Sequence, residues 1–426
     1  MWVNDTANLL KLAVIGQGYV GLPLAMRAVE AGYDVVGIDF DAQRIGMLSN
    51  GESYVDDISD QVLRAAIDSG RYHAVTEYAP AEGFDFAVIT VPTPLRNATP
   101  DLSYIESASR SLGPLVTRGA TVILESTTYP GTTQELMVPI LEELSGLTAG
   151  VDFFAGYSPE RIDPGNQKFS FKTTPKIVSG INPASLERVT SLFSDLVDTT
   201  VPVSTPREAE MAKLLENTFR HVNVALVNEL AVYAHELGVN VWETIEAAST
   251  KPFGFMKFTP GPGVGGHCLP IDPSYLSWKV KTDLGRNFRF VELANDVNDH
   301  MPEHVVNRAM HLLNEHSKAL RGSKILVIGV AYKKDSSDAR ESPAVGVIRL
   351  LNEFGADVYG IDSHVEDRYW PEGATRAELS ADLVAAADLA IVVTDHSDID
   401  VTLLEGVDTP VFDTRNKLTG ENVTVL

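Results

Sequence analysis

The chain has 426 residues, a length that predicts two or three domains. Hydrophobic residues make up 44% and charged residues 22%, a balance typical of globular proteins. Its 58 acidic residues outnumber 34 basic ones, and the formal net charge of −24 disfavours a nucleic-acid partner. One cysteine excludes an internal disulfide and any zinc site built from several thiolates, and we expect no bound metal. With neither a long apolar run nor a basic leader before its first apolar stretch, we expect a cytoplasmic protein that does not bind membranes.

The first predicted elements form a β-α-β unit. The segment KLAVIGQGYVGLPLAMRAVEAGYDVVGID predicts a buried strand, a glycine turn, an amphipathic helix and a second strand that ends at Asp39. Gly16, Gly18 and Gly21 give the pattern G-x-G-x-x-G, in which they permit a tight turn, approach of a pyrophosphate, and close helix packing. Asp39 is expected to bind the adenosine ribose, which favours NAD over NADP. A glycine turn without a ligand remains the alternative.

Two more strands follow, in DFAVITVPTP and TVILESTT, so the first domain is expected to be a doubly wound sheet. The two prolines of VPTP end their strand and leave residues 91–94 as a rigid loop. Ligands of such folds bind at the carboxyl edge of the sheet, where this loop is expected to lie.

A long helix is predicted from residue 205 onward. Thr205 as N-cap, Pro206 at the first helical position and Glu208 form a capping box, and Gly238 ends the helix. Helical spacing predicts a buried apolar stripe, and such a helix between two similar domains suggests a homodimer. The stripe consists of Leu214, Val222, Ala225, Leu226 and Leu230.

Lys213 and Asn217 lie four residues apart on this helix and therefore share a face. Both side chains could point into a cleft. A solvated lysine beside a polar neighbour remains the alternative on these residues alone.

The chain then repeats its first pattern. KILVIGVAYK, ADVYGID and ADLAIVVTD echo KLAVIGQGY, YDVVGID and FDFAVITVP, which predicts a second Rossmann-like domain without the three glycines. We therefore expect an α/β protein with two Rossmann-like doubly wound domains joined by a long central helix. The expected domains are residues 1–204, which bind NAD, 205–319, which are helical, and 320–426, which bind a different nucleotide.

The only cysteine, Cys268, lies in GPGVGGHCLPIDP, residues 261–273. Four glycines and three prolines predict a rigid loop that a ligand can approach closely, although an inert buried thiol is the commoner state of a lone cysteine. Asp272 could order a water or proton partner nearby. We interpret the adjacent His267 as structural.

Several motifs in fixed order resemble the NAD-dependent nucleotide-sugar 6-dehydrogenases, the family of UDP-glucose and UDP-N-acetylhexosamine dehydrogenases. They are GQGYVGLPLA, VPTP, EST, SPERIDPG, AEMAKLLENTFR, GPGVGGHCLPIDP and AYKKDSSDARESP. The resemblance spans nearly the whole chain. It implies oxidation of a sugar C6 alcohol to a carboxylate by two NAD in succession, through a thiohemiacetal and a thioester on Cys268.

The resemblance also implies roles for other residues. Lys213 would stabilise oxyanion character at C6 with Asn217 as its partner, and Asp272 would organise water. Glu160 would be the base for thioester hydrolysis, with Thr127 beside the water. The implied cofactor contacts are Gly16, Gly18, Tyr19, Val20, Gly21, Asp39, Arg44, Val91, Pro92, Thr93, Thr127 and Arg340. The implied substrate contacts are Glu160, Arg161, Lys213, Asn217, Lys251, Phe258, Gly265, Lys333 and Arg415.

The implied substrate is a UDP-sugar. UDP-glucose dehydrogenases commonly carry a second acidic residue after SPE, where this chain has Pro164 in SPERIDPG. The resemblance to the UDP-N-acetylglucosamine branch ranks UDP-GlcNAc first, UDP-ManNAc second and UDP-glucose third.

Two other function classes remain as alternatives. One is a two-electron dehydrogenase or an epimerase, since Tyr275 and Lys279 form the Y-x-x-x-K pair of short-chain reductases, although far from the first sheet. The other is a scaffold that binds NAD and UDP-sugar without turnover.

Overall fold

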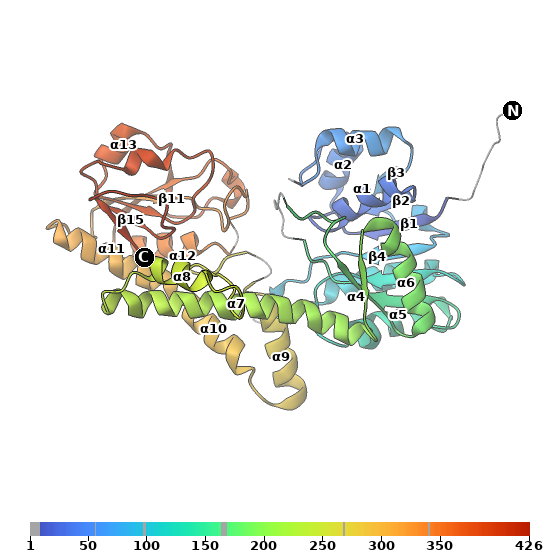
Figure 1. The fold of residues 1–426 in the computed structure, drawn as a ribbon. Helices are drawn as coiled ribbons and strands as arrows, with labels where there is room; N and C mark the ends of the chain where they lie inside the picture. The colour runs from blue at the N-terminus through green and yellow to red at the C-terminus, as the bar shows by residue number, and fades with distance from the viewer. Residues whose placement is uncertain (1–8, 56, 97–98, 163–167, 267–268, 340) are drawn as a thin grey trace. The chain divides into compact units, whose positions relative to one another are not determined.

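A computed structural model describes residues 9–55, 57–96, 99–162, 168–266, 269–339 and 341–426. The chain forms two compact units, residues 1–216 and 217–426. Helix α7 (Pro206–Glu236), 31 residues long, is continuous from the first unit into the second (Figure 1).

The first unit is built on one eight-stranded sheet with strand order β10-β9-β8-β7-β4-β1-β2-β3. Neighbouring strands are parallel except β8 and β9, which are antiparallel. The strands are β1 (Lys11–Ile15), β2 (Asp34–Ile38), β3 (Tyr72–Val75), β4 (Phe86–Ile89), β7 (Thr121–Leu124), β8 (Phe154–Tyr157), β9 (Lys176–Gly180) and β10 (Thr200–Pro202); β5 (Leu95–Arg96) and β6 (Thr99–Pro100) form a separate hairpin. The predicted β-α-β unit and both further strands are confirmed.

Helices cover both faces of this sheet because every central strand is apolar on both sides. In β1, Leu12 and Val14 enter one core with residues of α1, α3 and α6, while Ala13 and Ile15 enter the other with residues of α4 and α5. The helices of this unit are α1 (Gly21–Ala31), α2 (Ala42–Ser49), α3 (Asp60–Asp68), α4 (Ser103–Leu112), α5 (Val138–Ser145) and α6 (Pro183–Leu196), with short turns η1 (Ala79–Ala81), η2 (Gly113–Leu115) and η3 (Thr133–Met137). This is the doubly wound arrangement that the sequence predicted.

The second unit carries a six-stranded parallel sheet with order β13-β12-β11-β14-β15-β16. Its strands are β11 (Lys324–Ile328), β12 (Asp357–Ile361), β13 (Thr375–Arg376), β14 (Leu389–Val392), β15 (Val411–Asp413) and β16 (Val423–Val425). Its other elements are α8 (Val241–Ser249), α9 (Asp272–Leu284), α10 (Arg289–Asp299), α11 (Met301–Glu315), α12 (Pro343–Glu353) and α13 (Ala381–Ala385), with η4 (Asp367–Tyr369) and η5 (Val401–Leu404). The repeat therefore predicted a second Rossmann-like sheet correctly.

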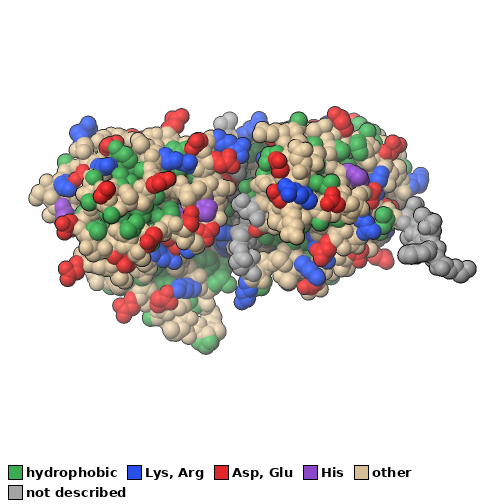
Figure 2. Space-filling view, turned by 90° about the horizontal axis from the view of Figure 1, so that it is seen from above, with side chains coloured by type: hydrophobic (Ala, Val, Ile, Leu, Met, Phe, Trp, Pro, Cys, Tyr) green, Lys and Arg blue, Asp and Glu red, His purple; other side chains and the backbone are tan. Residues whose placement is uncertain are grey.

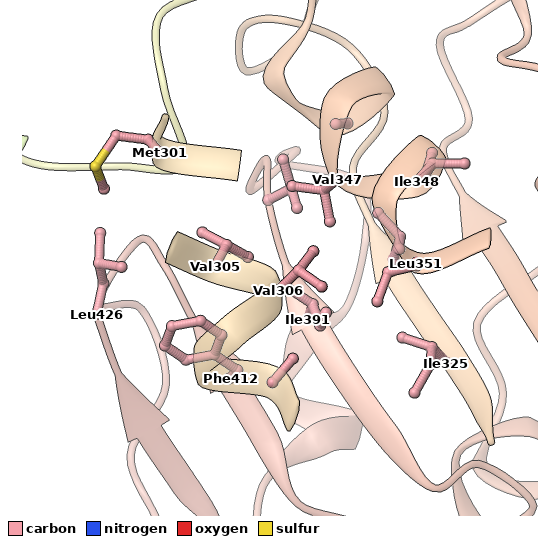
Figure 3. Close-up of a cluster of buried hydrophobic side chains, with 14 of the residues drawn as sticks. Met301, Val305, Val306, Ile325, Val347, Ile348, Leu351, Ile391, Phe412 and Leu426 are labelled. Carbon is pink, nitrogen blue, oxygen red and sulfur yellow. The ribbon is translucent and has the colours of Figure 1, made fainter. Parts of the chain in front are cut away.

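This second sheet also has a core on each face. Figure 3 shows Val305 and Val306 of α11 together with Val347 and Leu351 of α12 above strand residues such as Ile325. The alternate residues of β11 face the opposite core, which includes Val384 of α13. The two sheets thus share one construction, in which strands alternate between two helix-covered cores.

Both ends of α7 follow the sequence prediction. Thr205 Oγ1 accepts the N–H of Arg207 at 3.3 Å and is hydrogen-bonded to the Glu208 carboxylate. After the last helical residue, Gly238 takes a positive φ of 68°, and the N–H of Val239 donates to Ala234 O at 2.8 Å. These bonds satisfy backbone groups at the two ends.

The predicted buried stripe of α7 is wrong in part. Leu214 is fully buried, Ala225 is buried and Val222 is half-buried, but Leu226 is 59% exposed and Leu230 is 42% exposed. The last two belong to a second apolar row, on a face that this chain leaves uncovered. The residues of this exposed row are Met211, Leu215, Phe219, Leu226, Leu230, Tyr233 and Leu237.

On the face seen in Figure 2, acidic and basic side chains are interspersed over the surface of each unit. Within the described residues, no helix combines the length and apolar character required to cross a bilayer.

Candidate functional site

The glycine turn between β1 and α1 has the geometry that a bound pyrophosphate needs. Gly16 has a φ of +96°, and a Cβ there would lie 2.8 Å from Thr90 O, so only glycine fits. A Cβ on Gly21 would lie 1.9 Å from Gly16 O, which reflects how closely α1 packs against the end of β1. At Gly18, no heavy atom of the described residues lies within 4 Å of the Cβ position. The turn is therefore tight at two glycines and open at the third, as a dinucleotide site requires.

Asp39 directly follows the last residue of β2 and lies beside this turn. Its Oδ2 accepts the N–H of Gln17 at 2.8 Å, and its Oδ1 accepts the N–H of Asp41 at 3.0 Å. Arg44 Nη1 lies 3.9 Å from Asp39 Oδ2, and its guanidinium carbon lies 5.5 Å from the centroid of the Tyr54 ring. Each carboxylate oxygen retains a further lone pair, so Asp39 can still accept hydrogen bonds from the ribose hydroxyls of NAD.

The other predicted cofactor contacts in the first unit follow β1, β4 and β7, which are neighbours in the sheet. Their carboxyl ends share one edge, so the fold brings these segments together. Ser126 Oγ donates to Val91 O at 2.7 Å and holds the loop that follows β4. Of these residues, Tyr19 and Pro92 are exposed, while Val20, Val91, Thr93 and Thr127 are half-buried.

A buried ionic group lies beside the predicted base Glu160. Lys176, the first residue of β9, places Nζ 2.8 Å from Glu160 Oε2 and in contact with Glu125 Oε1. The side chains of Glu125, Lys176 and Glu160 are 0%, 4% and 13% exposed. Only Glu160 of the three therefore has appreciable access to solvent.

Burial and neighbouring charges shift the pKa values of the two carboxyl groups in opposite directions. Burial raises the pKa of Glu125 to about 8, an effect that Lys176 opposes and Glu160 increases. Burial would also raise the pKa of Glu160, but the Lys176 ammonium and hydrogen bonds hold it below its ordinary value. Sequence reasoning missed Glu125 and Lys176, which are 51 residues apart. The sequence signal that could have found them is a charged residue directly after one apolar strand, Glu125 after β7, and another at the start of a second, Lys176 in β9.

The Glu160 carboxylate is also held by the backbone of the two residues that follow it. Its Oε1 accepts the N–H groups of Arg161 and Ile162, each at 2.6 Å. The guanidinium of Arg161 bonds both carboxylate oxygens of Glu216, at 3.2 and 2.6 Å, and donates to Pro175 O at 2.7 Å. Arg161, predicted as a substrate contact, is thus anchored to α7.

On α7, Lys213 is 9% exposed and Asn217 is 5% exposed, so the alternative of a solvated lysine is wrong. Asn217 Nδ2 donates to Asp272 Oδ2 at 2.5 Å, and Asp272 itself is 4% exposed. Because Asp272 is the first residue of α9, this bond ties α9 to α7. Asn217, the predicted partner of Lys213, is thus bonded to the predicted water-organising Asp272, a contact that the sequence did not predict.

The glycine-rich loop before α9 packs closely on the second sheet's connecting segments. A Cβ on Gly265 would lie 2.8 Å from Tyr332 Cβ and 2.8 Å from Pro343 Cδ. The N–H of Gly261 donates to the Asn228 side chain on α7 at 2.9 Å. Glycines in this loop therefore permit close packing within the second unit.

The other predicted substrate contacts lie in different parts of the second unit. Arg415 donates from Nε to Val393 O at 2.6 Å, and burial lowers its pKa. Phe258 packs edge-on against Phe219, with ring centroids 5.8 Å apart. Lys333 is half-buried, whereas Lys251 is exposed and lies 5.0 Å from the Phe253 ring centroid.

Four residues named from the sequence lie outside the described residues. They are Pro164, His267, Cys268 and Arg340.

The reductase-like pair is not arranged for catalysis. Tyr275 is fully buried within α9, and Lys279 forms an ion pair with Asp283 at 3.0 Å. The match to Y-x-x-x-K is therefore coincidental.

One cluster could hold a cation, although its groups already bind one another. The possible ligand atoms of Asp335, His364, His396 and Asp398 lie within 4.8 Å of one another. The buried His396, however, accepts the N–H of Asp335 at Nδ1, at 3.0 Å, and bonds Asp362 through Nε2 at 2.9 Å. A metal would have to displace the first of these bonds.

Comparison with known families covers most of the chain. Residues 10–197 match the NAD-binding domain of the UDP-glucose/GDP-mannose dehydrogenase family, residues 207–300 its central domain, and residues 326–420 its UDP-binding domain.

Individual proteins are similar over nearly their whole length. A UDP-N-acetyl-D-mannosamine dehydrogenase from Pyrococcus horikoshii is 36% identical over 91% of this chain and 90% of its own. A UDP-N-acetyl-D-glucosamine 6-dehydrogenase from Pseudomonas aeruginosa is 37% identical over 86% of each chain. A solved structure of the P. horikoshii UDP-D-ManNAc dehydrogenase superimposes with a TM-score of 0.88, at 33% identity and 98% coverage of both chains. The protein therefore belongs to the UDP-glucose/GDP-mannose dehydrogenase family, and its cofactor is NAD.

Proposed function

We propose that the protein oxidises the C6 hydroxyl of a UDP-sugar to a carboxylate, with two NAD used in succession. UDP-GlcNAc is the first candidate, UDP-ManNAc the second and UDP-glucose the third. The names of two relatives, at 37% and 36% identity, support the class of UDP-N-acetylhexosamines. The product would be a cytoplasmic precursor of cell-surface polysaccharide.

In this proposal each predicted domain has one task. Residues 1–204 bind NAD, residues 205–319 carry the catalytic lysine and cysteine, and residues 320–426 bind the UDP-sugar. The family's NAD-binding, central and UDP-binding models match within these three ranges and support the division.

The proposed chemistry has three steps. The C6 alcohol loses a hydride to NAD and a proton, which gives an aldehyde. The Cys268 thiolate adds to that aldehyde, and loss of a second hydride converts the resulting thiohemiacetal into a thioester. Water then adds to the thioester carbonyl, the carbon–sulfur bond breaks with its electron pair on sulfur, and the acid leaves.

The observation that carries this proposal is the buried hydrogen bond between Asn217 and Asp272. It fixes the start of α9, four residues beyond Cys268, against the helix that carries the buried residue Lys213. A preorganised cation is what an alkoxide or oxyanion at C6 requires, and the Asp272 carboxylate holds the Asn217 amide in place beside it on the same helix.

The other roles are assigned on the same basis. Glu160 would take a proton from the hydrolytic water with Thr127 beside it, and Arg44 and Arg340 would contact NAD. The proposed contacts with the UDP-sugar are Arg161, Lys251, Phe258, Gly265, Lys333 and Arg415.

We also propose that two chains form a homodimer through the exposed apolar row of α7. Leu226, Tyr233 and Leu237 are 59%, 54% and 76% exposed in the single chain, and α10 adds the exposed Phe290 and Leu293. An uncovered apolar row of this kind is typical of an interface. Light scattering should give the dimer mass, and Leu226→Glu with Leu230→Glu should give the monomer mass.

The function is tested by NAD reduction with UDP-GlcNAc, UDP-ManNAc, UDP-GalNAc, UDP-glucose and UDP-galactose, with mass spectrometry of the products. We expect two NADH per sugar consumed and a uronic acid product. One NADH per sugar would identify a two-electron dehydrogenase, and binding without NADH would identify a scaffold. Cys268→Ser should bind the sugar yet form no uronate, because an alkoxide is far harder to generate than a thiolate.

A further inference from the structure

The buried group of Glu125, Lys176 and Glu160 holds two carboxylates but only one cation. Lys176 Nζ contacts both carboxylates and lies over the Phe171 and Phe193 rings, 5.1 and 5.3 Å from their centroids. These aromatic rings exclude water from the ammonium, so its charge is little screened. Two negative charges therefore compete for one buried positive charge.

The two carboxylates differ in what else supports them. Glu160 has two backbone N–H donors at 2.6 Å and is partly accessible. Glu125 is fully buried, and its Oε2 has no hydrogen-bond partner among the described residues. A carboxyl group with an unsupported buried oxygen is the one of the pair that keeps a proton more readily.

Among the described residues, no hydrogen bond or ion pair joins Lys176, Glu125 or Glu160 to a further charged side chain. The nearby guanidinium of Arg161 is committed to Glu216 and to Pro175 O. The helix packed over the group, α6, presents the uncharged ring of Phe193. The protonation of Glu125 therefore decides how the charge of Lys176 is divided.

We propose that Glu125 is a positioning residue for Glu160: through Lys176 it sets how strongly the Glu160 carboxylate is neutralised, and hence how readily that carboxylate takes a proton from water. With Glu125 neutral, the whole ammonium charge stabilises ionised Glu160, which is then a weak base. With Glu125 ionised, the ammonium is shared and Glu160 becomes a stronger base. This inference rests on the proposed function, in which Glu160 serves the hydrolysis of the thioester.

The step itself is balanced. The water oxygen bonds to the thioester carbon while one water proton passes to Glu160, the carbon–sulfur bond breaks, and the thiolate of Cys268 leaves. Glu160 then releases that proton to solvent and the thiolate takes one up from solvent, so the products are the acid and the thiol. Glu125 and Lys176 touch neither the sugar nor the water in this scheme.

The test measures release of the acyl group as a function of pH. Wild-type enzyme is quenched with acid during turnover, and intact mass spectrometry gives the fraction of enzyme that carries the sugar acyl group. The turnover rate divided by this fraction gives the rate of acyl release. Since burial raises the pKa of Glu125 to about 8, the wild-type release rate should rise about three- to tenfold between about pH 7 and 9. Glu125→Gln should release slowly at both pH values and accumulate the acyl-enzyme.

Two further variants separate this role from a structural one. Glu125→Asp, which keeps a titrating carboxylate, should restore the rise with pH. Glu210→Gln removes the other fully buried glutamate of this unit, which has no bond to Lys176. That control should lower the melting temperature but keep the wild-type rise. A Glu125→Gln enzyme that retains the wild-type rise would overturn the inference, and so would a Glu125→Asp enzyme that lacks it.

The NADH yield of the wild type distinguishes failure of the inference from failure of the proposed function. Wild-type enzyme that yields two NADH per sugar, with equal pH responses in wild type and Glu125→Gln, overturns the role of Glu125 alone. Wild-type enzyme that yields no NADH with any UDP-sugar overturns both.

Discussion

Asp39 Oδ2 accepts the backbone N–H of Gln17 at 2.8 Å, so the acid that directly follows β2 is bonded to the glycine turn that follows β1. One residue thus has two tasks, because it is expected to bind the ribose of NAD and it shapes the turn that receives the pyrophosphate. Both tasks belong to the first unit.

Asp39→Ala should therefore weaken NAD binding about 10- to 100-fold, which corresponds to the loss of one or two hydrogen bonds to a charged group. Binding of UDP, assigned to the last domain, should stay within about twofold of wild type. Isothermal titration with each ligand checks both expectations. An unchanged dissociation constant for NAD would contradict the ribose assignment.

Gly18 and Gly21 should respond differently to alanine. Gly21→Ala would place a Cβ 1.9 Å from Gly16 O and should destabilise the first unit by about 1–3 kcal/mol. Gly18→Ala meets no heavy atom of the described residues within 4 Å, so its melting temperature should match the wild type. Its affinity for NAD should nevertheless fall, because the methyl group occupies the space where the pyrophosphate approaches.

Thermal melting and NAD titration of the two variants form one experiment. If Gly18→Ala bound NAD as tightly as the wild type, the turn would not be the pyrophosphate site. A stable Gly21→Ala variant would mean that α1 can move away from β1 at little cost.

The two sheets were predictable because their information is local. Runs such as LAVI and ILVI are apolar at every position, as strands buried on both faces must be, and glycine or proline marks their ends. The glycine turn was predictable for the same reason, since Gly16, Gly18 and Gly21 lie within six residues of one another.

The uncovered row of α7 was not predictable. Helical spacing shows that Leu226 and Leu230 share a face, but it does not show which apolar face the same chain covers. The group around Lys176 was missed because Glu125 is 51 residues away and only the sheet order brings them together. Long-range ionic pairs leave no periodic signal in one sequence.

Asn217 and Asp272 should be energetically coupled, because the amide donates to a buried carboxylate at 2.5 Å. Asn217→Ala and Asp272→Ala should each cost about 1–3 kcal/mol, and the double variant should cost less than the sum by about 1 kcal/mol or more. Urea denaturation of the four proteins gives this coupling energy. Simple additivity would mean that the bond does not hold α9 to α7.

Glu210 should make the first unit less stable as the pH rises. This fully buried side chain on α7 accepts hydrogen bonds from Gly131 N at 2.6 Å, Thr133 N at 2.9 Å and Thr133 Oγ1 at 2.7 Å. Burial raises its pKa to about 7, and these bonds only partly oppose that effect. These hydrogen bonds connect α7 to the turn before α5. Weakening them should therefore loosen the contact between α7 and that turn.

The sign of the pH dependence follows from that raised pKa. The folded protein holds the proton more tightly than the unfolded chain, whose glutamates titrate near 4.5. The stabilisation that protonated Glu210 contributes is thus complete below about pH 4.5. It is lost as the pH rises through 7, and the loss in the free energy of unfolding is up to about 3 kcal/mol. Glu210→Gln cannot ionise, although its amide would oppose the N–H of Gly131. It should melt below the wild type at pH 5, and the difference should narrow by pH 8. Melting curves at pH 5, 6, 7 and 8 measure this, and parallel pH dependences for the two proteins would show that Glu210 is ionised throughout.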